Sequence, residues 1–503
     1  MVGQIRMNPS LASLIFACGI AGLFYLDRDK SLRTSKALWL PVIYFWIIGS
    51  RPVSAWLGIS LTPGTNAQLD GNPFDAAIYG LLLIAAIVVL LLRSQRTCRL
   101  LAANWPIVVY FLYCLISVTW SSHTDVALKR WIKALDDLAM CLVIVTDRQP
   151  GEALKRLIAR VGFVLLPASL LLIKYYGNLG RGYSPDGVPA NTGVTTNKNV
   201  LGVMLFIVSL YTLWRVITLL RNPDQPNRGR HLLAQCALLA FGAILLKMAD
   251  SKTSIACFLL GGGIIFVTGL RAIRRRPARV HLLCLGVFLF GGLTMLFGGE
   301  SGVAQVMGRQ SDLSGRTDIW TALIAAAPNP IVGAGFESFW ISPSVQIFQH
   351  ALLVKGWWHP AHLNEAHDGY LEVYLNLGII GVGLIAWILL SGYKWAVAAY
   401  RRNPSIGGLM IAYIIVSAFY NITEAGFRML DLQWVFLLLV IFSASGIAAG
   451  LFGEKASKVP ASRNSSAKGI PAGKGPELES ETVYASQLIN QRASYYLPLS
   501  NVH

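Results

Sequence analysis

Apolar runs of about twenty residues recur along this chain and constrain its fold more than any other feature. The hydrocarbon core of a bilayer is about 30 Å thick, and an α-helix needs about 20 apolar residues to cross it. Only 14% of the residues are charged, against about 25% in an average soluble domain. A helix also satisfies its own backbone hydrogen bonds in lipid. The sequence therefore predicts an all-α polytopic membrane protein.

The spacing of these runs predicts about 12–13 transmembrane helices. The apolar runs are 11–26, 37–56, 75–92, 104–120, 134–146, 157–174, 199–219, 232–248, 254–270, 280–297, 368–392, 406–420 and 431–452. Short basic loops alternate with longer loops that are richer in Gly, Pro and aromatic residues. Since cytoplasmic loops retain Lys and Arg, this alternation predicts an outer N-terminus and an inner C-terminus.

This topology divides the chain into four parts. Residues 1–297 are expected to hold helices 1–10, and residues 298–367 to form a long periplasmic loop before the third-last helix. Residues 368–452 are expected to hold helices 11–13. Residues 453–503 are polar and rich in Gly, Ser, Pro and Lys, which predicts a disordered cytoplasmic tail.

The net charge of +18 does not indicate nucleic-acid binding, because the cations lie mostly in the short loops that set orientation. The cations that remain on the outer side are more informative. They include Arg130, Lys198, Lys252, Arg316 and Arg428. Each one alone is equally explained as an anchor at a helix end. Together they favour an outward-facing site for a diphosphate.

Three segments carry a resemblance to a known family: SGRTDIW at 314–320, PNPIVGAGFESFW at 328–340 and NEAHDGYLEVYLNLGIIGVGL at 364–384. With TNKNVLG at 196–202 and ADSKTS at 249–254, they resemble the O-antigen ligase and exopolysaccharide polymerase (Wzy-type) family. Within it, the chain is most similar to bacterial exopolysaccharide polymerisation proteins. PNPIVGAGF lacks the spacing of a nucleotide loop and is better explained as a Gly/Pro turn that lets a loop approach the membrane closely.

The resemblance implies a metal-independent, cofactor-free, inverting glycosyltransferase in the bacterial inner membrane, with its active site facing the periplasm. Its donor would be an oligosaccharide linked to undecaprenyl pyrophosphate, surrounded by membrane lipid. The product would be an exopolysaccharide or O-antigen chain. A ligase that transfers the glycan to lipid A core shares the same motifs. A chain-length-determining co-polymerase is the protein partner that the resemblance suggests.

By that resemblance, Arg316 corresponds to the family arginine that contacts the pyrophosphate, and His367 to the histidine that activates the acceptor hydroxyl. Lys252 stands where many members carry Arg, and it lacks the fork suited to bidentate phosphate contact. Arg130 and Lys198 are further candidates for the diphosphate, because charge-assisted bonds to phosphate are strong. The alternative for Arg316 is a loop arginine paired with Asp312 or Asp318.

An imidazole with its ordinary pKa accepts a proton at neutral pH, which suits His367 to activating a hydroxyl. Either Asp368 or Glu365, both close in sequence, would orient the ring. The alternative is an interface histidine beside a helix that Asp368 caps, although Asp368 also counts as a candidate for substrate binding. Glu424 is a second candidate base or sugar-binding carboxylate. Trp320 is a candidate for stacking on a sugar ring, or else a residue of the interfacial belt.

Two other interpretations carry less support. His359, His362 and His367 do not fall on one helical face and have no accompanying cysteine, so no metal site is predicted. A flippase or transporter would place its charges near the bilayer midplane and show inverted repeats. In this sequence the charges fall at the outer edge and no repeat is visible.

Overall fold

The computed structural model describes residues 7–29, 34–59, 71–183, 187–297, 312–355 and 363–451. Within these ranges, side chains are not described at 288, 290–297 and 312–317. The predicted tail at 453–503, with His359 and His362 and residues 298–311 of the predicted periplasmic loop, therefore lies outside the described residues.

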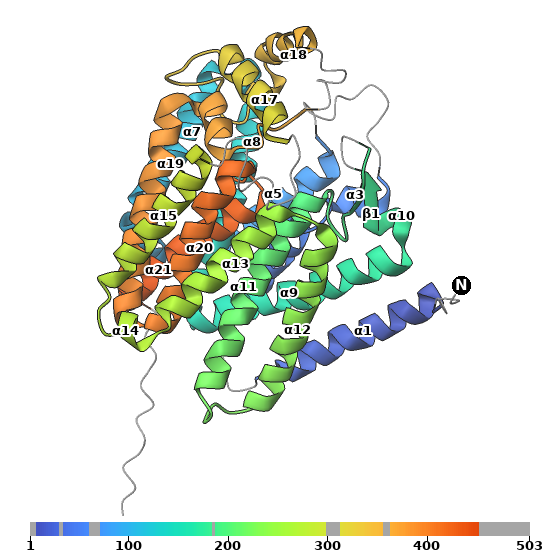
Figure 1. Ribbon diagram of the computed structural model, residues 1–503, viewed down its shortest axis with the longest axis vertical. Helices are drawn as coiled ribbons and strands as arrows, with labels where there is room; N and C mark the ends of the chain where they lie inside the picture. The colour runs from blue at the N-terminus through green and yellow to red at the C-terminus, as the bar shows by residue number, and fades with distance from the viewer. Residues whose placement is uncertain are drawn as a thin grey trace, which may run out of the picture. The chain divides into compact units, whose positions relative to one another are not determined.

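The predicted all-α class is confirmed (Figure 1). The α-helices are α1 (Pro9–Leu26), α2 (Trp39–Ile48), α3 (Val53–Leu57), α5 (Pro73–Leu91), α6 (Ser94–Ala103), α7 (Trp105–Ser117), α8 (Thr124–Val145), α9 (Pro150–Tyr175), α10 (Gly177–Gly180), α11 (Lys198–Arg221), α12 (Arg228–Ala249), α13 (Lys252–Thr268), α14 (Arg271–Arg274), α15 (Arg279–Phe297), α17 (Asp312–Ala326), α18 (Ser344–Val354), α19 (Gly369–Arg402), α20 (Pro404–Thr423) and α21 (Leu432–Ala448). Short 3-10 helices cover Lys36–Leu38, Val118–Trp120 and Phe339–Ile341. A small antiparallel hairpin pairs β1 (Arg181–Tyr183) with β2 (Pro189–Asn191), with Gly182 opposite Ala190.

Within the described residues, seven helices are long and apolar enough to cross a membrane. An eighth span is added if α6 and α7, which meet at a bend of 88°, count as one. The number is below the predicted 12–13 because several apolar runs form shorter helices. The run at 37–56 is divided among a 3-10 turn, the ten residues of α2 and the short α3. Helices α13 and α21 have 17 residues each. The run at 134–146 is the second half of α8, whose first half carries charged residues.

The helices differ sharply in burial, and this separates an inner group from an outer one. Four-fifths of the apolar windows of α11 and α20 are buried, against about a tenth for α1 and a fifth for α5. Every residue of α21 from Leu432 to Ile447 is buried. Tyr413 of α20 donates a hydrogen bond of 2.6 Å to the carbonyl of Ile207 in α11. The apolar sides of α1 and α5 therefore remain available to lipid.

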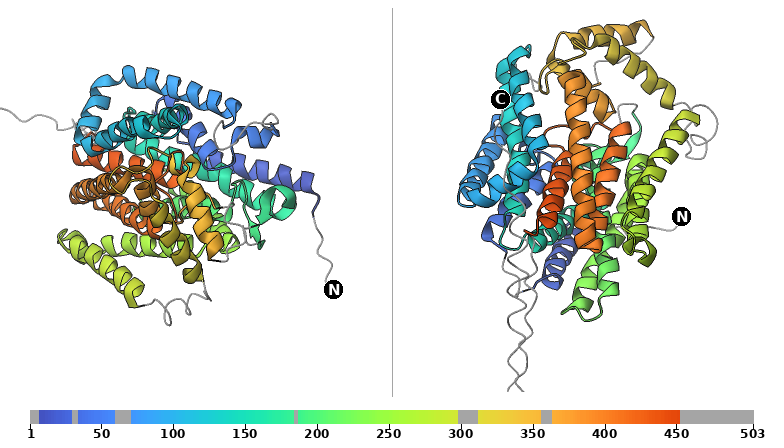
Figure 2. Two further views of the ribbon diagram at one scale, coloured as in Figure 1. Left: turned by 90° about the horizontal axis from the view of Figure 1, so that it is seen from above. Right: turned by 90° about the vertical axis from the view of Figure 1, so that its left-hand side faces the viewer.

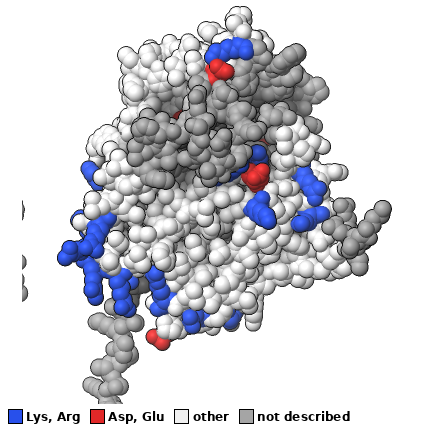
Figure 3. Space-filling view, viewed as in Figure 1, with Lys and Arg blue, Asp and Glu red and all other residues white. Residues whose placement is uncertain are grey.

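The two ends of the helix bundle differ in charge. Helices α17 and α18 lie at the upper end, in two views at right angles (Figures 1 and 2). Helix α14 and the turn between α11 and α12 lie at the lower end in Figure 1. Several Lys and Arg side chains run along the lower edge in Figure 3. Around α14, the side chains of Arg271, Arg274, Arg275, Arg276 and Arg279 are all exposed.

Helix α19 is broken at Gly378, whose φ of 63° and ψ of −167° are not helical. The segment from Pro330 to Gly335 docks against this break. The amide groups of Ala334 and Gly335 donate to carbonyls of α19 just before Gly378, and those of Ile379 and Ile380 donate back to the segment. A Cβ atom on Gly378 would lie 2.1 Å from the carbonyl oxygen of Ile331. The Gly/Pro segment therefore does make a close approach, and its partner is the backbone of α19.

Candidate active site

His367 lies between two carboxylates at the upper end of the bundle. Its Nδ1 atom is 3.0 Å from Oε1 of Glu365 and 3.8 Å from Oε2 of Glu424. The side chains of His367 and Glu365 are one-quarter and three-tenths exposed, so the group faces solvent. Glu424, by contrast, is buried. Sequence reasoning proposed His367 and Glu424 separately, and the fold brings them together from residues 57 positions apart.

The loop that carries His367 is held by its neighbours. Trp320 of α17 donates from Nε1 to the carbonyl of Ala366 at 2.9 Å. The amide of Ala366 donates to Oε2 of Glu372 at 3.0 Å. Asp368 is the N-cap of α19 and accepts from the amide of Leu371 at 2.8 Å. Two residues proposed to bind substrate, Trp320 and Asp368, are thus placed where they support the loop.

Three residues without glycine's freedom adopt left-handed backbone at this site: Glu337, His367 and Leu430, with φ between 50° and 58°. This conformation is uncommon outside glycine and is often found where function imposes it. At His367 it turns the chain directly before Asp368, the N-cap of α19. The backbone here is set by surrounding contacts, because the residue itself does not favour it.

Glu424 connects the histidine to the helices that carry the predicted lysines. Asn199, in the first turn of α11, donates from Nδ2 to Oε2 of Glu424 at 3.0 Å. Lys198 is the first residue of that helix. Lys252 is the first residue of α13, and the hydroxyl of the following Thr253 lies 3.2 Å from that of Thr423. Both lysines therefore enter from helix starts next to Glu424.

Arg428 is the centre of the charge network at this site. Its guanidinium lies within 4.0 Å of the carboxylates of Glu337, Glu365 and Glu372. Burial lowers the pKa of Arg428, but these three carboxylates raise it more. Glu372 is 1% exposed and also accepts from Nε1 of Trp340 at 2.6 Å. The network fixes three loops and the start of α19 relative to one another.

Arg130 reaches the same network from α8. It donates from Nη1 to the backbone carbonyl of Glu337. The Glu337 carboxylate in turn accepts from the amide of Met429 at 3.1 Å. Arg130 is therefore part of the frame behind Glu337.

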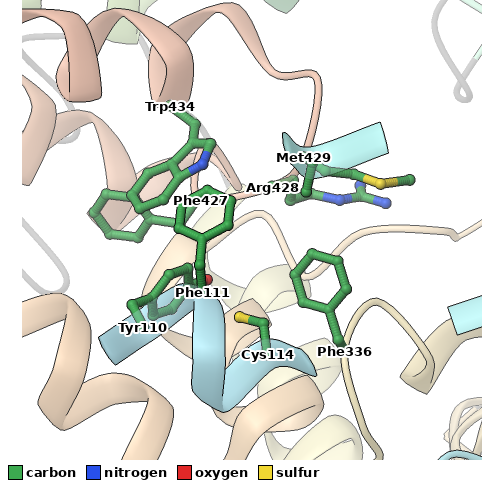
Figure 4. A pocket seen from close by; sticks show the side chains of 9 residues that line it. Tyr110, Phe111, Cys114, Phe336, Phe427, Arg428, Met429 and Trp434 are labelled. Atoms are coloured by element: carbon green, nitrogen blue, oxygen red, sulfur yellow. The ribbon is translucent and has the colours of Figure 1, made fainter. Parts of the chain in front are cut away.

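A polar pocket of about 320 Å³ opens beside His367. Its polar lining comes from Asn197, Glu337, Asn364, Glu365, Arg428 and Asp431. On another side of Arg428 is a much smaller apolar cavity of about 10 Å³, lined by the rings of Tyr110, Phe111, Phe336, Phe427 and Trp434 (Figure 4). Phe427 packs edge-on against both Tyr370 and Trp434. The smaller cavity is therefore part of the packing that supports the 424–431 loop.

The side chain of Arg316 lies outside the described residues, and its backbone belongs to the second turn of α17. The position of its guanidinium therefore stays a prediction. One of its two alternative partners, Asp318, is engaged by Lys355, whose Nζ lies 2.8 Å from Oδ1.

The electrostatics of His367 bear on both metal binding and catalysis. Burial lowers the pKa of His367, but the carboxylates of Glu365 and Glu424 raise it more, to about 9. Ligand atoms of these three residues lie within 4.8 Å of one another, which is close enough to share a metal ion. Metal binding requires a neutral imidazole, and the raised pKa of His367 favours the protonated form at neutral pH. The geometry fits an imidazolium between two carboxylates, and the absence of a metal stays a prediction.

Four residues of this site were not identified as such from the sequence: Asn199, Glu337, Glu372 and Asp431. One of them carried a usable signal. Glu372 falls inside the predicted span 368–392, and an ionisable residue in an apolar span is by default a functional candidate. The others come from loops or helix starts, and their sequence positions do not indicate that they meet.

Comparison with known proteins supports the resemblance. Residues 236–387 match the sequence model of a family described as O-antigen ligase. This range contains Lys252, Arg316 and His367 and excludes Arg130, Lys198 and Glu424. The chain is also 26% identical over 299 residues to the exopolysaccharide production protein ExoQ of Rhizobium meliloti. The match covers 57% of this chain and 64% of that protein, so the chain spans less than two thirds of that relative's length.

Proposed function

We propose that this multi-pass membrane protein, which carries an O-antigen ligase domain at 236–387, polymerises lipid-linked oligosaccharide repeats into an exopolysaccharide. The observation that carries the proposal is the pairing of His367 with Glu365 and Glu424, of which Glu365 also lines a polar pocket. The name of the similar protein supports exopolysaccharide production. The donor is proposed to be a glycan linked to undecaprenyl pyrophosphate.

The proposed reaction is a single displacement. A hydroxyl oxygen of the acceptor sugar attacks the anomeric carbon of the donor, and the bond from that carbon to the pyrophosphate oxygen breaks. The hydroxyl proton passes to a neutral His367, and undecaprenyl pyrophosphate leaves with the bonding electron pair. Attack opposite the leaving group inverts the anomeric carbon. A positioned base of this kind contributes about 10²–10⁴ in rate.

The leaving pyrophosphate is an anion, and the residues around His367 are mostly acidic. Cations from elsewhere must therefore balance its charge. Arg316, Lys198 and Lys252 are the proposed contacts. Guanidinium and ammonium groups stabilise the charge that develops on a departing phosphate. Arg130 is assigned a supporting role, because its guanidinium donates to the Glu337 backbone.

The proposed active site lies on the periplasmic side of the inner membrane. The exposed arginines around α14 lie at the end of the bundle opposite α17, and cationic loops are retained in the cytoplasm. His367 lies at the α17 end, since the Ala366 carbonyl accepts from Trp320. Lipid-linked donors are available on that side of the membrane, and the site would take them directly from the bilayer.

A ligase that transfers the finished glycan to an acceptor such as lipid A core is the second candidate, favoured by the description of the matched family. The two differ in what accumulates when the gene is deleted. Loss of a polymerase leaves single lipid-linked repeats, whereas loss of a ligase leaves long lipid-linked chains. We expect single repeats.

Complementation of the deletion strain tests the proposed base. His367→Asn is the sharper variant, because Asn tolerates left-handed backbone better than most residues and so preserves the loop. We expect this variant to reach the membrane in normal amount and to make no polymer. Normal chain length and yield would exclude His367 as the base. Glu152→Gln is a matched control, since Glu152 forms a surface ion pair with Lys155.

A further inference from the structure

The polar pocket beside His367 has the lining of a site for sugar hydroxyls. Its volume of about 320 Å³ falls within the range of about 300–1,000 Å³ that is typical of small-ligand sites. Carboxyl groups come from Glu337, Glu365 and Asp431, and carboxamides from Asn197 and Asn364. Carboxylates accept hydrogen bonds from hydroxyl groups, and carboxamides both donate and accept them.

The charge of this lining opposes an anionic ligand. Three carboxyl groups face a single guanidinium, that of Arg428, among the described residues that line the pocket. That guanidinium is already within 4.0 Å of the carboxylates of Glu337 and Glu365. Burial raises the pKa of Asp431 to about 7, so this group carries a partial charge at neutral pH. The carboxylates of Glu337 and Glu365 outnumber the guanidinium of Arg428. With the adjoining groups included, Glu372 and Glu424 make four carboxylates, against the three cations Arg428, Arg130 and the protonated His367.

One residue of the pocket lining contacts the proposed base. Glu365 lines the pocket, and its Oε1 lies 3.0 Å from Nδ1 of His367. A sugar held by this lining therefore lies next to the imidazole, as an attacking hydroxyl requires. A diphosphate would meet carboxylates at the same position, and like charges side by side are costly. The pocket therefore fits the acceptor and excludes the leaving group of the donor.

We infer that this pocket binds the terminal sugar of the acceptor glycan, and that it selects a neutral sugar over one that carries a carboxylate. The identification of the ligand as an acceptor rests on the proposed function. The preference for a neutral sugar rests on the pocket alone.

Paired sugars test the inference directly. The full-length protein in nanodiscs is titrated with the methyl β-glycosides of glucose, galactose and mannose, and with the matching uronides, which differ by one carboxylate. Binding is followed by saturation-transfer NMR. We expect at least one neutral glycoside to bind about tenfold more tightly than its uronide, as like-charge juxtaposition predicts.

Two substitutions at the exposed Asn364 shift this ratio in opposite directions without disturbing the core. Asn364→Lys adds a cation at the pocket and should bring the ratio close to one. Asn364→Asp adds a carboxylate and should widen it several-fold. Glu337→Gln should narrow it, and its thermal unfolding is measured to establish that the network survives. Glu152→Gln should leave the ratio unchanged.

Three outcomes would each overturn the inference. They are equal binding of neutral and acidic glycosides, no binding of any glycoside, and a binding ratio that neither Asn364 variant changes. Polymer formation by the wild-type protein from lipid-linked repeats is measured in parallel. Selective glycoside binding without polymer would overturn the proposed polymerase function and leave the neutral-sugar preference standing. Polymer formation without selective glycoside binding would overturn the neutral-sugar preference and leave the proposed polymerase function standing.

Discussion

The raised pKa of His367 predicts how the rate of polymer formation depends on pH. With a pKa of about 9, about 1% of the imidazole is neutral at pH 7 and about half at pH 9. If the neutral form accepts the proton of the acceptor hydroxyl, the rate should rise about fiftyfold between these pH values. Replacing the closer carboxylate tests the cause. In Glu365→Gln the pKa should fall toward its ordinary value, and the rise should shrink to less than about tenfold.

The assay is the initial rate of polymer formation by purified protein in proteoliposomes with lipid-linked repeats, measured at constant ionic strength. Glu152→Gln is the control and should keep the slope of the wild type. A wild-type rate that is flat or that falls between pH 7 and 9 would refute this reasoning, because the protonated form would then be the active one. An unchanged slope in Glu365→Gln would show that Glu365 does not set the pKa.

Four further predictions rest on contacts described above. The pKa of His367 in the folded protein lies above the ordinary 6.5, so its stabilising effect is complete below about pH 6.5 and is lost as pH rises toward about 9. The unfolding temperature should fall across that pH window. His367→Asn should lack this part of the pH dependence. The Glu372 carboxylate accepts from Trp340 and from the Ala366 amide, and Glu372→Gln places an amide group against these donors. The free energy of unfolding should fall by about 2–3 kcal/mol, and polymer yield should fall with it. Thermal unfolding and complementation measure the two effects. Gly378→Ala should destabilise the protein by at least about 2 kcal/mol, since left-handed backbone disfavours a Cβ and this Cβ meets the Ile331 carbonyl. Gly383→Ala should be neutral or stabilising, because a Cβ there meets nothing within 4 Å. The reverse order in thermal unfolding would contradict the account of the break in α19. Chelator treatment should leave the rate of polymer formation unchanged, and a loss restored by a divalent cation would point to a metal at Glu365, His367 and Glu424.

The helical class was predictable because hydropathy acts on each segment independently of the rest. The number of spans was less so. The run at 37–56 has the composition of a span, yet the chain turns after Ile48, and composition alone does not locate such an end. For the site, the sequence indicated His367 and Glu424 but not their contact.

The acidic network was harder to predict for a physical reason. Glu337, Glu365 and Glu372 lie in different segments, and Arg428 brings them together. Nothing in the local sequence of any of them indicates a shared partner. Trp320 shows the opposite case, because an aromatic ring suited to stacking on sugars has its indole N–H directed to the Ala366 carbonyl. A residue of a type that suits sugar binding can therefore serve to hold the loop that carries His367.

The broken helix α19 determines where chimeras between relatives should be cut. The start of α19 is an apparent boundary between the outer segment and the membrane helix. A cut there would separate residues 330–335 from backbone partners on both sides of Gly378. The outer segment and the first turns of α19 should be exchanged as one cassette, with the junction beyond Ile380. Chimeras cut at residue 368 should therefore be produced at lower levels than those cut beyond 380, even when every side chain of the active site is retained.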